Sequence, residues 1–207
     1  MTVSARDALD RLREGNRRFA ADLRGIDAFM TARRRAELAA GQEPFAIVLG
    51  CSDSRVPAEI VFDQGLGDLF VIRVAGNIVA PSQIGSVEFA AERFGTRLVV
   101  VLGHSQCGAV VATLDELRAP AANQSRNLRA IVDRVRPALE GLLATNPDAL
   151  VHEAVRANIR ASVAQLRRGS DILEQLVRED GLVIVGAEYS LDTGVVEFLP
   201  EPSGTGT

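Results

Sequence analysis

Four short runs of apolar residues set the strongest limit on how this chain can fold. The runs are rich in Val and Ile, and they are apolar at consecutive positions rather than at every second one. Consecutive apolar positions are typical of strands that are buried on both faces, as in a parallel sheet. The four runs are FAIVLG (45–50), LFVIRV (69–74), LVVVLG (98–103) and LVIVGA (182–187).

Helical patterns lie between these runs, so strands and helices alternate along the chain. This alternation predicts an α/β fold with helices flanking a central, mostly parallel sheet of four strands, and we expect the strand order 2-1-3-4. A further apolar run at 195–199 follows a turn at 192–194 and predicts an antiparallel edge strand. The helical patterns cover residues 56–62, 83–94, 107–117, 126–143 and 151–177.

The two ends of the chain lack apolar runs of this kind. Residues 1–40 are predicted to form an N-terminal helical arm, in which Ser4 caps a first helix with Asp7 three residues on. The last residues, 200–207 (PEPSGTGT), are predicted to be a disordered tail. Because no linker or internal repeat interrupts the sequence, we expect residues 1–207 to form a single domain.

Composition excludes several kinds of chemistry. All 23 basic residues are Arg, so the chain has no lysine for a phosphate-binding loop or a Schiff base. A net charge of −4 with scattered Arg predicts no nucleic-acid partner. No apolar run approaches the roughly 18 residues of a membrane span, which predicts no membrane association. The N-terminus is charged from Arg6 onward and lacks the apolar core of a signal peptide, so we expect a cytosolic protein.

The scarce reactive residues fall at strand ends. Cys51 directly follows the first apolar run, His104 directly follows the third, and Cys107 comes three residues later. In the strand order 2-1-3-4 the first and third strands are neighbours, and ligands of parallel sheets collect at such carboxyl ends. Two thiolates and an imidazole form a known catalytic zinc set with an open fourth position. Water, substrate or the Asp53 carboxylate could fill that position.

Other interpretations of the same residues remain open at this point. A Cys at a strand end is commonly an inert core residue. Cys51 could instead be a nucleophile with His104 as its base, although the C-x-x-x-R spacing of residues 51–55 is too short for the loop of a thiol phosphatase. A disulfide between Cys51 and Cys107 is not expected in a reducing compartment.

Two motifs identify a family that the sequence resembles. CSDSR (51–55) followed by GHSQCG (103–108) is similar to the paired motifs of the β-class carbonic anhydrases, and the spacing between the two motifs also fits. The resemblance extends from about residue 5 to residue 198. It includes EGNRRF (14–19), GDLFVIRVAGN (67–77) and GSVEFA (85–90).

The resemblance implies an activity and a set of site residues. The activity is zinc-dependent reversible hydration of carbon dioxide to bicarbonate and a proton, by attack of a zinc-bound hydroxide. Cys51, His104 and Cys107 would be the ligands of one Zn²⁺ per subunit. Asp53 and Arg55 match the catalytic Asp–Arg dyad of the family. In a closed state of the family, Asp53 would leave Arg55 and become the fourth zinc ligand.

The resemblance also implies substrate-binding residues of the plant-like subtype. Gln42 matches a glutamine that hydrogen-bonds the substrate, and Phe70 matches an apolar wall of the CO₂ pocket. Phe89 stands where the subtype usually has Tyr, so the ring is kept and the hydroxyl is lost. The backbone N–H of Gly108 is suited to a bicarbonate oxygen. The other histidine, His152, is interpreted as an exposed helix residue.

The resemblance also implies an assembly of several subunits, and two rival functions remain open. The family forms homodimers or homotetramers, and the apolar stripe of the first helix is predicted to pack on a partner subunit. One rival function is hydrolysis of carbonyl sulfide or carbon disulfide on the same scaffold. Another is a non-catalytic zinc-binding or redox-responsive module.

Overall fold

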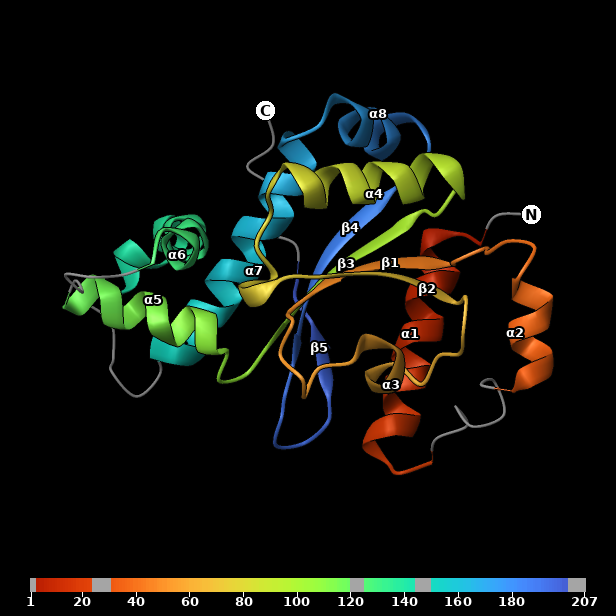
Figure 1. Ribbon diagram of the computed structural model, residues 1–207, viewed down its shortest axis with the longest axis horizontal. Coiled ribbons are helices and arrows are strands. Elements are labelled where there is room, and N and C mark those ends of the chain that lie inside the picture. The colour runs from red at the N-terminus through yellow and green to blue at the C-terminus, as the bar shows by residue number, and fades with distance from the viewer. Residues whose placement is uncertain (1–2, 24–30, 120–124, 144–149, 201–207) are drawn as a thin grey trace.

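The computed structural model describes residues 3–23, 31–119, 125–143 and 150–200. Its centre is one five-stranded sheet in the order β2-β1-β3-β4-β5 (Figure 1). The first four strands are parallel, and β5 is antiparallel to β4. The predicted α/β fold, strand order and edge strand are therefore confirmed. The strands are β1 (Ala46–Gly50), β2 (Leu69–Arg73), β3 (Leu98–His104), β4 (Val183–Tyr189) and β5 (Val196–Phe198).

Helices cover both faces of the sheet, which explains the unbroken apolar runs. Every residue of β1 and β3 is buried. One face packs against a core to which α4, α7 and α8 contribute, and the other against α1 and α3. The helices are α1 (Ala5–Ala20), α2 (Ala32–Leu38), α3 (Ala58–Val61), α4 (Pro81–Arg93), α5 (Gly108–Arg118), α6 (Arg126–Leu139), α7 (Leu150–Arg168) and α8 (Asp171–Glu179), with single 3₁₀ turns η2 (Ala75–Asn77) and η3 (Glu140–Leu142).

The N-terminal arm begins as the sequence predicts. The side chain of Ser4 accepts a hydrogen bond from the Asp7 N–H at 3.1 Å and caps α1. Ala8 and Leu12, on the apolar stripe of α1, are fully buried against the chain's own core. Within a single chain this stripe is thus already covered, contrary to our expectation that it needs a partner subunit. The predicted tail, from residue 201 on, lies outside the described residues.

A buried asparagine fastens α1 to the rest of the domain. The Nδ2 atom of Asn16 donates to the carbonyls of Val61 and Gly194 at 3.1 and 2.9 Å. Its Oδ1 atom accepts the Val196 N–H at 2.8 Å. Asn16 therefore links α1 to α3 and β5, on the face of the sheet opposite to α7.

We expect the substitution Gly15→Ala to destabilise the fold, although alanine is ordinarily the better helix residue by about 1 kcal/mol. A Cβ at Gly15 would lie 1.8 Å from the carbonyl oxygen of Phe62, so α1 would have to move away from α3. Overpacking of this kind costs about 1–3 kcal/mol. Urea unfolding measures the loss. The control is Gly85→Ala in α4, where a Cβ meets nothing within 4 Å and a gain of up to about 1 kcal/mol is expected. A Gly15→Ala protein as stable as the parent would contradict the prediction.

Helix α7 packs against two glycines of the sheet. A Cβ at Gly103 of β3 or at Gly186 of β4 would come within 2.6 Å of the Ile159 side chain. Glycine at these two positions therefore lets α7 approach the carboxyl ends of the strands.

Among the described residues, no helix is long and apolar enough to cross a membrane.

Candidate metal centre

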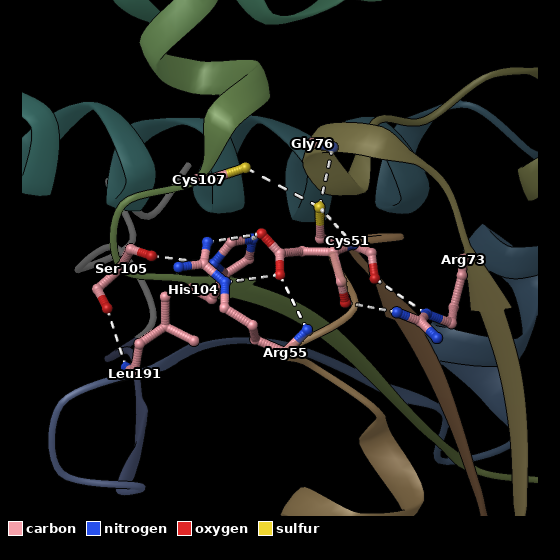
Figure 2. Close-up of polar contacts among 9 residues, drawn as sticks. Cys51, Arg55, Arg73, Gly76, His104, Ser105, Cys107 and Leu191 are labelled. Carbon is pink, nitrogen blue, oxygen red and sulfur yellow. Dashed lines mark hydrogen bonds and ion pairs between the residues drawn. The ribbon is translucent and has the colours of Figure 1, made fainter.

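Both cysteines and one histidine meet at the carboxyl ends of β1 and β3. Cys51 directly follows β1, His104 is the last residue of β3, and Cys107 immediately precedes α5. Because β1 and β3 are parallel neighbours, their ends bring these side chains together (Figure 2). One ligand atom from each of the three lies within 4.8 Å of the others, and all three residues are buried. The two Sγ atoms are 4.0 Å apart and form no disulfide.

The imidazole of His104 is poised to bind a cation. Its Nδ1 atom lies 2.9 Å from the Ser105 carbonyl oxygen, which accepts a hydrogen bond when Nδ1 carries the proton. Its Nε2 atom is buried and has no hydrogen-bond partner in the part of the chain that the structure describes. A buried nitrogen with a free lone pair beside two sulfurs fits a metal ligand, and a Cys₂His donor set fits zinc.

The contact between the two sulfurs shifts the pKa values of the two cysteines in opposite directions. The Sγ atom of Cys51 accepts the backbone N–H groups of Asp53 and Gly76, each at 3.4 Å. The hydrogen bond from Cys107 is the main cause that lowers the pKa of Cys51 to about 4, against the opposing effect of burial. The same contact, with burial, raises the pKa of Cys107 well above its ordinary range. A divalent cation between the sulfurs would offset the repulsion between two thiolates.

The Asp53–Arg55 pair lies at the rim of this group. Nε and Nη2 of Arg55 donate to the two carboxylate oxygens of Asp53 at 2.9 and 2.8 Å, and the Arg55 backbone N–H adds a third bond at 3.0 Å. These bonds hold the pKa of Asp53 well below its ordinary range. Oδ2 of Asp53 is 3.9 Å from Nε2 of His104. The pair therefore presents a carboxylate directly to the centre while Arg55 remains half exposed.

One arginine at the site went unnoticed in the sequence. Arg73, the last residue of β2, donates from Nε to the Cys51 carbonyl at 3.1 Å and from Nη2 to the Asp53 carbonyl at 2.6 Å (Figure 2). Its two bonds fix the loop that carries both side chains. The available signal was a charged residue at the end of an otherwise apolar run.

The predicted substrate-binding residues divide into two groups. Gly108 is the first residue of α5 and adjoins Cys107. Gln42 lines a pocket with Phe45 and Thr96 at the amino end of the sheet. From Phe45 to Cys51 the strand rise alone spans roughly 20 Å. Gln42 and Cys51 of one chain are therefore at opposite ends of β1.

The two phenylalanines also lie away from the cysteines. Phe70 pairs in register with Ile47, the second residue of β1. Its ring centroid is 6.2 Å from that of Phe89, and both rings contact Phe94. Phe89 is half exposed, with 52% of its surface accessible. The structure thus gathers the phenylalanines into an aromatic cluster near the amino end of the sheet.

His152 does not join the metal centre. It lies on α7, where its exposed ring contacts the buried carboxylate of Glu188, with 3.4 Å between Nε2 and Oε2. Arg156 donates to the same carboxylate at 2.7 Å. This arrangement agrees with the interpretation of His152 as an exposed helix residue.

A parallel α/β sheet with a buried Cys₂His group at its switch point defines a class of metal-binding α/β protein. Comparison with known proteins is more specific. The sequence matches the family model described as "Carbonic anhydrase" over residues 46–196. It is 41% identical over 185 residues to carbonic anhydrase 2 of Mycobacterium tuberculosis, covering 88% of this chain and 87% of that protein. The chain therefore belongs to the carbonic anhydrase family.

Solved structures agree in fold and show that the chain belongs to the β class of this family. A β-carbonic anhydrase of Aspergillus fumigatus matches with a TM-score of 0.73 and 27% identity, over 82% of this chain and 83% of that one. A tetrameric β-carbonic anhydrase of Sordaria macrospora matches with a TM-score of 0.71 and 25% identity, over 80% and 85%.

Proposed function

We propose that the protein catalyses the reversible hydration of CO₂ to bicarbonate and a proton with one Zn²⁺ per subunit, held by Cys51, His104 and Cys107. The observation that carries this proposal is Nε2 of His104, which is buried with two sulfurs within 4.8 Å and has no hydrogen-bond partner among the described residues. When bound, zinc supplies Lewis-acid chemistry that lowers the pKa of a water molecule from about 15.7 toward 7.

Asp53 and Arg55 are assigned the orientation of the nucleophile. The Asp53 carboxylate accepts a hydrogen bond from the attacking water or hydroxide and aims its lone pair at the carbon of CO₂. Arg55 keeps that carboxylate ionised and fixed through two parallel bonds. Because Asp53 is engaged with Arg55, we assign this arrangement to the open state. The closed state would require Asp53 to release Arg55 and become the fourth ligand.

Substrate binding is assigned to Gly108, Gln42, Phe70 and Phe89. The backbone N–H of Gly108 lies at the start of α5, where an anion such as bicarbonate is favoured. The other three residues lie at the far end of the sheet from Cys51, so within this proposal a second copy of the chain must supply them. We accordingly propose a homodimer or homotetramer of single-domain subunits. The tetrameric assembly of the Sordaria relative supports this proposal.

A cytosolic location remains part of the proposal. It follows from the role proposed for Cys51 and Cys107, whose sulfurs lie 4.0 Å apart and must stay reduced to bind zinc. A reducing compartment would preserve both thiols as metal ligands.

The test is zinc content measured together with stopped-flow CO₂ hydration across a range of pH. We expect one zinc per subunit, CO₂ hydration well above the buffer rate, and loss of both in Cys51→Ser. Sedimentation of the same zinc-loaded sample should give at least a dimer. A zinc-replete protein inactive at every pH would contradict the proposal and leave a non-catalytic zinc or redox module. More efficient release of sulfide from carbonyl sulfide would favour the hydrolase.

A further inference from the structure

The turn that follows β2 touches a proposed zinc ligand through its backbone. In η2 (Ala75–Asn77), Gly76 and Asn77 both have left-handed backbone conformations, with φ of 69° and 43°. In this turn the Gly76 N–H donates a hydrogen bond to Sγ of Cys51, with 3.4 Å between the two atoms (Figure 2). Glycine adopts many conformations at little cost, so something else must hold its peptide in this one.

Two polar side chains of α7 supply that restraint. Nδ2 of Asn158 donates to the Gly76 carbonyl at 2.8 Å, and Oγ of Ser162 donates to the Asn77 carbonyl at 3.1 Å. Asn158 and Ser162 are 2% and 4% exposed and lie four residues apart, so they share one face of the helix. Each fixes one of the two peptide units that follow the Gly76 N–H.

The close approach of α7 makes these bonds possible. Ile159, the neighbour of Asn158, lies directly over Gly103, the residue before His104. Burying an amide and a hydroxyl is costly unless they are hydrogen-bonded. Asn158 and Ser162 both donate their hydrogen bonds to η2, a turn that carries no proposed ligand side chain.

We propose that Asn158 and Ser162 are positioning residues, which hold the Gly76 N–H on the Cys51 sulfur and so set the direction and charge of that thiolate toward zinc. The inference rests on the zinc site proposed above. An N–H···S hydrogen bond withdraws electron density from a thiolate and fixes its orientation. Partners of this kind change metal affinity by about 10- to 100-fold when they are removed.

The experiment compares Asn158→Ala with the parent in two measurements that do not depend on turnover. The first is the zinc dissociation constant by competition with a chromophoric chelator. The second is the absorption spectrum of the Co²⁺-substituted protein. We expect zinc affinity to weaken about 10- to 100-fold. We also expect the sulfur-to-cobalt charge-transfer band to move to lower energy, because the thiolate becomes more electron-rich.

Asn16→Ala is the matched control. Asn16 is a second buried asparagine that donates to backbone carbonyls, those of Val61 and Gly194, but it does so on the opposite face of the sheet. This variant should lose thermal stability while keeping the parent's zinc affinity and cobalt spectrum. A merely structural role for Asn158 would give the same pattern in Asn158→Ala, and that result would overturn the inference.

Ser162→Ala decides the question if Asn158→Ala does not fold. It removes one hydroxyl, and we expect a smaller shift of both readouts in the same direction. An unchanged dissociation constant and spectrum in Ser162→Ala would then reject the inference. Failure of the parent protein itself to bind zinc would instead reject the proposed function.

Discussion

Replacing His104 by alanine is expected to raise the zinc dissociation constant about 100-fold or more, and to reduce CO₂ hydration to the rate of the buffer. Structural zinc is bound with about 10–16 kcal/mol in small domains, so one ligand in three accounts for several kcal/mol. Nε2 of His104 is the only imidazole nitrogen within reach, because the other histidine lies on α7 in contact with Glu188. The sequence therefore holds no substitute ligand of this type.

Thermal unfolding with and without zinc checks this result independently of activity. Zinc at 100 times its dissociation constant should stabilise the parent by about 2.7 kcal/mol, and it should stabilise His104→Ala far less. His152→Ala is the matched control and should keep the parent's zinc affinity. Parent-like zinc binding by His104→Ala would remove this residue from the metal centre.

The substitution Asp53→Asn is expected to lower kcat for CO₂ hydration about 100- to 10,000-fold while zinc content stays at the parent level. Asparagine has nearly the same shape, but it carries no charge and turns an NH₂ donor toward a guanidinium that also only donates. The bidentate contact with Arg55 is therefore lost, and with it the acceptor that orients the nucleophile. Stopped-flow assays on metal-quantified samples separate the two effects.

A second Asp–Arg pair provides the comparison. Asp10 accepts a hydrogen bond from Arg13 at 3.1 Å on the exposed surface of α1, and exposed pairs of this kind contribute little. Asp10→Asn should leave kcat unchanged. If Asp53→Asn lost zinc in proportion to its loss of activity, the role assigned to Asp53 would be wrong.

Much of the fold could be predicted because burial on both faces leaves a plain mark in the sequence. The four apolar runs correspond to strands with ends that differ by one or two residues, and the strand order placed β1 beside β3. From that order alone, Cys51 and His104 had to meet. The resemblance to a known family then identified zinc as the metal that this group of side chains is expected to bind.

Residues that act through backbone carbonyls could not be predicted in this way. Arg73 and Asn158 donate to backbone carbonyls 20 and 82 positions away in the sequence, and a sequence does not distinguish one backbone carbonyl from another. One signal existed for α7. Asn158 and Ser162 occupy the stripe, spaced by four residues, that Leu150, Ala154 and Leu166 otherwise fill with apolar side chains. A polar pair on an otherwise apolar stripe indicates a buried partner.

The close packing of α7 on Gly103 and Gly186 restricts the substitutions that this protein can tolerate. The same helix turn that presents Ile159 to these glycines also presents Asn158 to the turn beside Cys51. Any substitution that shifts α7 outward to gain room in the core would pull Asn158 from its carbonyl. Mutational drift in this part of the core is therefore tied to the metal centre, and we expect tolerated replacements at Ile159 to be those that preserve its volume.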